Sequence, residues 1–224
     1  MCGRFTLRAP ASAIAEHFAV PGEMPPVAPR YNIAPSEPIL AVRLNPAATP
    51  QRGLVRLRWG MIPHWAKDPA IGNRMINARA ETVAEKPAYK AAFRRRRCLV
   101  PADGFYEWRK NGGRRQPYFI RLPDDGLFAF AGLWESWEGP DHSAIESCTL
   151  LTTEPNELVR PIHNRMPVIL PPEHYDCWLD PAEQDPARLV PLFRPYPADL
   201  MRRHRVSTLV NSPRNNSPEC IAPA

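Results

Sequence analysis

Apolar and polar residues alternate in a series of short segments along the chain, and this spacing predicts half-buried strands. In Leu54–Trp59, for example, Val55, Leu57 and Trp59 are apolar and the residues between them are arginines. One face of this strand is therefore apolar and the other is basic. The same pattern predicts further strands at Ile39–Leu44, Cys98–Val100, Phe105–Arg109, Gln116–Leu122, Leu127–Trp134, Ser147–Thr153, Val168–Leu170 and Arg205–Val210.

The predicted strands follow one another closely and are separated by turn residues. Asn111-Gly112-Gly113 and Asp125-Gly126 are typical of tight turns, because these residues tolerate positive φ. Pro21–Pro35 is predicted to be a loop, and strands outnumber helices. We therefore expect an α+β fold around a curved antiparallel sheet. The segments with helical character are short, namely Ala11–Val20, Thr82–Phe93, Asn156–Ile162 and Pro172–Leu179.

The composition adds two features to this pattern. The chain has 29 prolines against 11 glycines, so its helices and strands should be short and joined by stiff loops. The formal net charge is +6, and almost all of the basic residues are arginines, which bind phosphate through a planar fork of donors. An origin in GC-rich coding DNA would explain the same arginine content, so composition alone leaves both interpretations open.

A chain of 224 residues can form one substantial core, and no linker or repeat divides it. We therefore expect a single domain spanning residues 1–224. The five cysteines show no CxxC or paired Cys/His spacing, so neither a metal site nor a cofactor is expected. No signal peptide and no run of roughly 18 apolar residues is present, which predicts a cytoplasmic protein with free thiols.

Cys2 is the first candidate for chemistry. A small second residue allows removal of Met1, which would leave a free α-amine beside a thiol on adjacent carbons. Such a 1,2-aminothiol condenses with an aldehyde to an imine and then closes to a five-membered thiazolidine. With pKa values near 8 and 8.5, both groups would be partly in their reactive forms at neutral pH. The alternative is that Cys2 belongs to a frayed, inert terminus.

Several short motifs follow one another in order from residue 2 to about residue 211. They are Met1-Cys2-Gly3-Arg4-Phe5, Arg30-Tyr31-Asn32-Ile33-Ala34-Pro35, Trp59-Gly60-Met61-Ile62-Pro63-His64-Trp65, Asn77-Ala78-Arg79-Ala80-Glu81, Arg97-Cys98-Leu99-Val100-Pro101-Ala102-Asp103-Gly104, Phe105-Tyr106-Glu107-Trp108 and His163-Asn164-Arg165-Met166-Pro167. Together they resemble the SRAP family (SOS response-associated peptidase domain), the abasic-site processing proteins. The tail Asn211–Pro218 fits more loosely and is given no role.

The resemblance implies a single α+β domain with a distorted antiparallel β-barrel-like core and short flanking helices. It also implies binding of single-stranded DNA in a basic cleft and a thiazolidine link to the abasic sugar. Cys2 matches the crosslinking nucleophile, and Asn77, Glu107 and His163 match the polar residues around it. We expect a monomer that associates with the nucleoid when it is bound to DNA.

Each polar residue of the motifs also has a chemical role that suits this reaction. Glu107 lies among Phe105, Tyr106 and Trp108, so burial would raise its pKa towards neutrality and allow proton transfer. His163 could protonate the sugar oxygen, and Asn77 could orient the amine and the sugar. The structural alternatives are a solvent-facing or Arg109-paired glutamate, a helix C-terminal histidine and a turn asparagine.

The DNA-binding candidates are three arginines and one tryptophan. By the resemblance, Arg4, Arg79 and Arg165 match phosphate-contacting positions, and each is close in sequence to a candidate catalytic residue. Trp65 could stack on a base, since stacking tolerates any sequence. Surface ion pairs for the arginines and a core position for the tryptophan remain the alternatives.

Two other functions use the same residues. Cys2, with Glu107 and His163, could attack a peptide carbonyl as an N-terminal nucleophile peptidase or amidohydrolase, for which the family was first named. The chain could instead be a non-covalent single-strand binding module in which Cys2 is incidental. Protease activity needs no DNA, whereas crosslinking needs a strand that carries an aldehyde.

Overall fold

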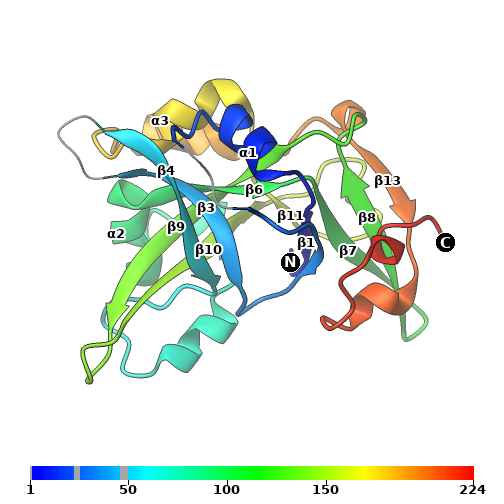
Figure 1. The fold of residues 1–224 in the computed structure, drawn as a ribbon, viewed down its shortest axis with the longest axis horizontal. Coiled ribbons are helices and arrows are strands. Elements are labelled where there is room, and N and C mark those ends of the chain that lie inside the picture. The colour runs from blue at the N-terminus through cyan, green and yellow to red at the C-terminus, as the bar shows by residue number, and fades with distance from the viewer. Residues whose placement is uncertain (1, 23–25, 46–49) are drawn as a thin grey trace.

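A closed ring of five strands forms the core of the computed structural model, which describes residues 2–22, 26–45 and 50–224. The order around the ring is β10-β4-β3-β6-β9 and back to β10 (Figure 1). This confirms the α+β class with a distorted β-barrel core. The strands are β3 (Pro38–Asn45), β4 (Gln51–Trp59), β6 (Arg97–Ala102), β9 (Phe128–Glu138) and β10 (Ala144–Thr153).

One pair of strands in the ring is parallel, which differs from the antiparallel expectation. Strands β3–β4, β3–β6, β6–β9 and β9–β10 are antiparallel, but β10 runs parallel to β4, with Ser147 opposite Arg58. The reason is topological. Directions cannot alternate all the way around a ring with an odd number of strands, so one pair must be parallel.

The inside of the barrel is filled by apolar side chains from alternate strand positions. Gly132 of β9 leaves room for Cys98 of β6, because a Cβ at Gly132 would lie 2.8 Å from the Cys98 Sγ. Phe5 packs edge-on against Trp59 and Phe130, with ring centroids 5.2 and 5.7 Å apart. These contacts join the N-terminal strand to the barrel core.

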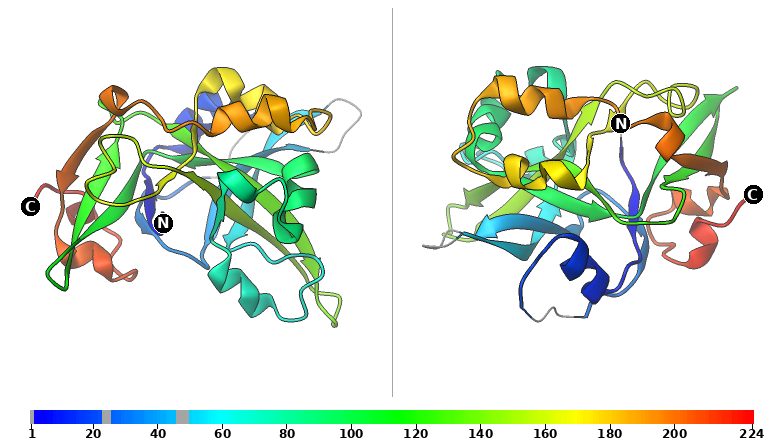
Figure 2. Two further views of the ribbon diagram at one scale, coloured as in Figure 1. Left: turned by 180° about the vertical axis from the view of Figure 1, so that it is seen from behind. Right: turned by 90° about the horizontal axis from the view of Figure 1, so that it is seen from above.

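A second sheet stands beside the barrel, in the order β13-β8-β7-β1-β2. Figure 2 shows the two at opposite ends of the molecule, with the N-terminal segment between them. The β7–β8 hairpin turns at Gly112 and Gly113, both with positive φ, which confirms the predicted turn. The strands are β1 (Phe5–Leu7), β2 (Arg30–Ile33), β7 (Gly104–Asn111), β8 (Arg114–Arg121) and β13 (Arg202–Arg205).

The helices are short, as the proline content predicts. None of the helices in the described ranges is long and apolar enough to cross a membrane. The α-helices are α1 (Ala11–His17), α2 (Pro87–Arg95), α3 (Tyr175–Leu179) and α4 (Pro186–Leu189). The 3₁₀ helices are η1 (Pro69–Arg74), η2 (Ala80–Thr82), η3 (Pro172–His174), η4 (Val190–Phe193), η5 (Ala198–Leu200), η6 (Thr208–Asn211) and η7 (Pro218–Cys220).

Three sequence-based expectations about elements were wrong. The helix predicted at Thr82–Phe93 is two elements, because Pro87 restarts it as the first residue of α2. Asn156–Ile162 forms turns, in which the Asn156 side chain accepts from the Val159 N–H. The strand predicted at Arg205–Val210 lies earlier, since β13 ends at Arg205 and η6 begins at Thr208.

Short strands account for the other differences. The predicted loop Pro21–Pro35 contains β2, and its residues 23–25 lie outside the described residues. The predicted strand Val168–Leu170 is confirmed as the shorter β12 (Ile169–Leu170), which pairs with β9. A separate short strand, β11 (Met166–Pro167), precedes it and pairs with β10. A further short strand, β5 (Asn77–Arg79), pairs in parallel with β10.

Candidate functional site

The N-terminal arm, residues 2–4, lies between β5 on the barrel side and β7 on the side of the second sheet. The side-chain amide of Asn77 on β5 donates to the carbonyl of Cys2 at 2.8 Å. On the other side, the N–H of Tyr106 on β7 donates to the carbonyl of Arg4 at 3.0 Å. Cys2 is fully buried between these two contacts, so the terminus is held rather than frayed.

Glu107 is a buried carboxyl next to this arm. Along β7 it points to the same side as Phe105, which packs in the barrel core, because residues two apart share a face. Only 2% of its surface is exposed, and burial raises its pKa to about 7. Glu107 is therefore divided between its acidic and basic forms at neutral pH, which suits a group that transfers protons.

His163 follows the turns at Asn156–Ile162 and lies over Glu107. Its Nδ1 is 4.0 Å from the Glu107 Oε1 and accepts from the Arg165 N–H at 3.1 Å. Burial lowers the pKa of His163, so the ring is mainly neutral near pH 7. The structure thus brings Cys2, Asn77, Glu107 and His163 together from four distant parts of the chain.

The Cys2 thiol differs from the sequence-based expectation of a partly ionised group. Burial raises its pKa well above the usual value, and the nearby Glu107 carboxylate adds to the shift. The thiol therefore stays protonated at neutral pH. All five cysteines are free, and burial also raises the pKa values of Cys98 and Cys148.

The three arginines singled out from the sequence lie in different environments. Arg165 forms a two-pronged ion pair with Glu81, at 2.5 and 2.9 Å, and also donates to the Thr152 carbonyl. The Nη1 of Arg4 donates to the Asn32 side chain and to the Val210 carbonyl. Arg79 is exposed at the end of β5. Two of the three guanidinium groups therefore already have protein partners.

Trp65 lies in a turn beyond β4, and 54% of its surface is exposed. An exposed ring of this size is free to stack on a base. Within the described part of the chain, no hydrogen bond or ring contact joins Trp65 to Cys2, Asn77, Glu107 or His163. The tryptophan is thus separate from the cluster around the N-terminal arm.

A hollow of about 410 Å³ beside the arm contains Arg4 and, in addition, residues that the sequence reasoning did not select. It is lined by Gly3, Arg4, Trp108, Arg115 and Asn211. The indole N–H of Trp108 donates to the Asn211 Oδ1 at 2.7 Å, which fixes the ring in the wall of the hollow. The sequence contains one indication of this site. Arg114 and Arg115 directly follow the hairpin turn at Gly112-Gly113, on the strand that pairs with the strand of Glu107.

Comparison with known proteins places the chain in a family. Residues 1–213 match the model of the SOS response associated peptidase (SRAP) domain. The chain belongs to the SRAP family. Its members include the abasic site processing protein YoqW of Bacillus subtilis, 48% identical over 99% of both chains. The abasic site processing protein HMCES of Gallus gallus is 37% identical over 87% of this chain and 66% of its own.

Solved structures agree with the SRAP fold described above. A protein from Bacteroides thetaiotaomicron superimposes with a TM-score of 0.86 at 25% identity, with both chains fully covered. A second, from Bordetella bronchiseptica, has a TM-score of 0.76 at 27% identity and covers 92% of this chain and 100% of its own.

Proposed function

We propose that this SRAP protein captures abasic sites in single-stranded DNA by a covalent bond to Cys2, once Met1 has been removed. The observation that carries the proposal is a nucleophilic residue held between a carboxyl of pKa about 7, a neutral histidine and an orienting amide. The relatives YoqW and HMCES are named for abasic site processing, which supports the same substrate. We expect a cytoplasmic monomer that needs no cofactor.

The reaction is a condensation that releases one water molecule. The Cys2 amine adds to the aldehyde carbon of the open abasic sugar, and the resulting carbinolamine loses water to give an imine. The thiol then adds its sulfur to that carbon and gives up its proton, which closes the thiazolidine. Proton transfers are needed at ring opening, at loss of water and at closure, and Glu107 has the pKa to serve each of them.

The raised pKa of the Cys2 thiol sets the order of these steps. A thiol held in its neutral form is a weak nucleophile. The amine therefore attacks first, and sulfur attacks only after the imine carbon has become strongly electrophilic. The ionised form of Glu107 accepts the thiol proton at that stage, which removes the need for a free thiolate.

In this proposal Asn77 orients Cys2, and His163 orients and protonates the sugar. Asn77 holds the Cys2 carbonyl with its amide nitrogen, and its Oδ1 is buried without a hydrogen-bond partner among the described residues. A buried acceptor of this kind is stabilised by a donor from substrate or from the mature terminus. His163 offers an Nε2 proton to the sugar oxygen while its Nδ1 stays bound to the backbone of Arg165.

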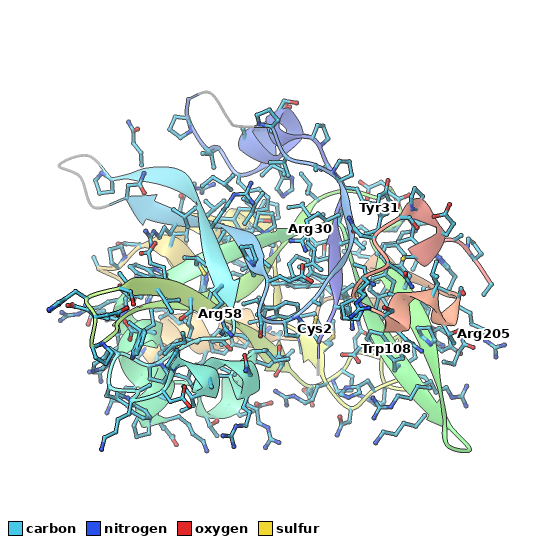
Figure 3. All side chains as sticks on the ribbon, turned by 60° about the horizontal axis from the view of Figure 1, so that its bottom comes forward. Cys2, Arg30, Tyr31, Arg58, Trp108 and Arg205 are labelled. Atoms are coloured by element: carbon cyan, nitrogen blue, oxygen red, sulfur yellow. The ribbon has the colours of Figure 1, made fainter. Side chains whose placement is uncertain are left out.

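Arg203 and Arg205 form an arginine cluster on β13, at the edge of the second sheet. Glu107, Tyr118 and Arg205 are opposite one another on β7, β8 and β13, so their side chains share one face. Arg205 donates to the Tyr118 hydroxyl at 3.4 Å, and Arg203 lies 5.8 Å from the Tyr118 ring. In Figure 3, Arg205 lies beyond Trp108 from Cys2. These cations suit the phosphates of the strand that flanks the lesion.

We predict that this cluster carries part of the salt dependence of binding. Replacing both Arg203 and Arg205 with glutamine should lower the slope of log K against log salt by about 0.7 for each phosphate that the variant no longer neutralises. The measurement is fluorescence anisotropy with an intact single-stranded oligonucleotide between low and moderate salt. Arg94→Gln with Arg95→Gln, on the exposed end of α2, is the matched control. Equal slopes in the two double variants would remove the cluster from the binding surface.

The proposal as a whole is tested with an oligonucleotide containing one uracil that uracil glycosylase has converted to an abasic site. The protein should give a band that survives denaturing electrophoresis, with a mass equal to the two components less one water. A protein whose intact mass still includes Met1 should give none. Cleavage of peptides without DNA, and no stable adduct, would favour the peptidase. Reversible binding alone would favour the non-covalent module.

A further inference from the structure

The motif Arg30–Pro35 has no role in the chemistry above, yet Asn32 within it is buried, with only 2% of its surface exposed. Asn32 lies on β2, next to the N-terminal strand β1 in the second sheet. Its Oδ1 accepts from the Nη1 of Arg4 at 2.8 Å. Its Nδ2 faces three backbone carbonyls, those of Val210, Ser212 and Asn215, at 3.2, 2.9 and 2.8 Å.

The C-terminal loop, residues 210–216, supplies the carbonyl acceptors of this network. The Val210 carbonyl also accepts from the Nη1 of Arg4 at 2.7 Å, so both hydrogens of that nitrogen are used within the protein. The loop is tied to β2 by a hydrogen bond from the Tyr31 N–H to Asn216 and to β7 by the bond from Trp108 to Asn211. Figure 1 shows the C-terminal segment running beside the second sheet.

The N-terminal arm depends on such contacts because it precedes a strand of only three residues. Two hydrogen bonds, from the Asn77 amide and from the Tyr106 N–H, hold the carbonyls of Cys2 and Arg4. The Arg4 side chain supplies a third contact. Three contacts fix the orientation of the arm, whereas two would leave the arm free to rotate. Arg4 makes this third contact through Asn32 and the C-terminal loop.

We infer that Asn32 is a positioning residue for Cys2, and that it acts by locking Arg4 to the C-terminal loop. The inference rests on the proposed crosslinking function. The role explains why an asparagine stands at this position, since both an acceptor and a donor are required on one short side chain. Loss of the lock lets the arm move, and small misplacements of a nucleophile lower its rate far more than its substrate's affinity.

The test compares Asn32→Ala and Asn32→Asp with the wild-type chain. Asn32→Asp keeps size and an oxygen for Arg4 but places an acceptor against the three carbonyls, so it breaks the contact with the C-terminal loop and keeps the contact with Arg4. The crosslinking rate at saturating abasic-site DNA should fall about tenfold in both variants. The DNA concentration for half-maximal rate should stay within about twofold.

A second measurement needs no DNA. Cys2 is fully buried, so its alkylation by iodoacetamide, followed by peptide mass mapping, reports the opening of the arm. Alkylation of Cys2 should be faster in both Asn32 variants, while Cys98 and Cys148 in the barrel should react at the wild-type rate. The matched controls are Asn73→Ala and Asn73→Asp, since the Asn73 Oδ1 also accepts from an arginine, Arg58, at 2.7 Å.

Three results would overturn the positioning role. They are unchanged alkylation of Cys2 in folded Asn32 variants, a loss of DNA affinity at an unchanged maximal rate, or equal effects of the Asn73 controls. If the wild-type chain forms no crosslink, the proposed function fails instead, and the alkylation rates still decide the role of Asn32.

Discussion

Cys2→Ala should abolish the stable crosslink to abasic-site DNA entirely. Alanine also allows removal of Met1, so the variant keeps a free α-amine at the same position but has no sulfur to close the ring. An imine still forms, and it hydrolyses during denaturing electrophoresis. The measurement is band intensity with and without borohydride, which reduces imines: the variant should be trapped only with borohydride, and the wild-type adduct should persist without it.

Cys2→Ser is the matched control for this experiment, because it keeps the shape of the side chain and replaces sulfur with the poorer nucleophile oxygen. It should behave as the alanine variant does. Because Cys2 is buried, folding of both variants is checked by thermal unfolding. A borohydride-independent band in Cys2→Ala would show that the stable bond does not need the Cys2 sulfur.

Glu107→Gln should slow crosslinking by about 100-fold or more, the range in which general acid–base groups act. The amide keeps the shape of the carboxyl but neither accepts nor releases a proton. The rate of the wild-type protein should change across pH 7, where Glu107 exchanges its proton, and this inflection should be absent in the variant. Single-turnover rates between pH 5.5 and about 8.5 provide the comparison.

The same substitution should change stability in a pH-dependent way. Glu107 has a higher pKa in the folded chain than in the unfolded one, so folded protein binds more protons between the two values and stability falls as pH rises through that window. Above pH 7 the buried charge destabilises the fold by on the order of 3 kcal/mol, which glutamine removes. Urea unfolding should show the variant more stable than wild type at pH 8, with no such gain at pH 4.5. A gain of equal size at both pH values would contradict the buried-charge explanation.

Local patterns were sufficient for the longer strands and for the hairpin. Alternation over Gln116–Leu122 and the Asn111-Gly112 turn predicted β7 and β8, because both signals act within a few residues. The strands β1 and β5 have three residues each, too few for any periodicity to show. Their pairing depends on partners far along the chain, which a local pattern does not contain.

The sequence indicated which four residues lie together and the direction of the Glu107 pKa shift, but not the protonation state of the Cys2 thiol. The order of motifs pointed to Cys2, Asn77, Glu107 and His163, and aromatic neighbours indicated the raised pKa of Glu107. Burial of the Cys2 thiol depends on packing between two sheets, so the sequence suggested a reactive thiol where the fold holds a protonated one. The partners of Arg4 and Arg165 were hidden for the same reason, since they come from distant segments.

The odd number of strands in the barrel has a consequence for Asn77. Strand β4 leaves its parallel partner β10 after Trp59, and β5 continues beside β10 from Asn77 onwards. The amide that contacts Cys2 is therefore carried by β5, which takes over the pairing with β10 where β4 ends. A register slip of one residue there would exchange Asn77 with the buried Ala78 and turn the amide away from Cys2. A change in length within Asn77–Arg79 would have the same effect on the position of the amide.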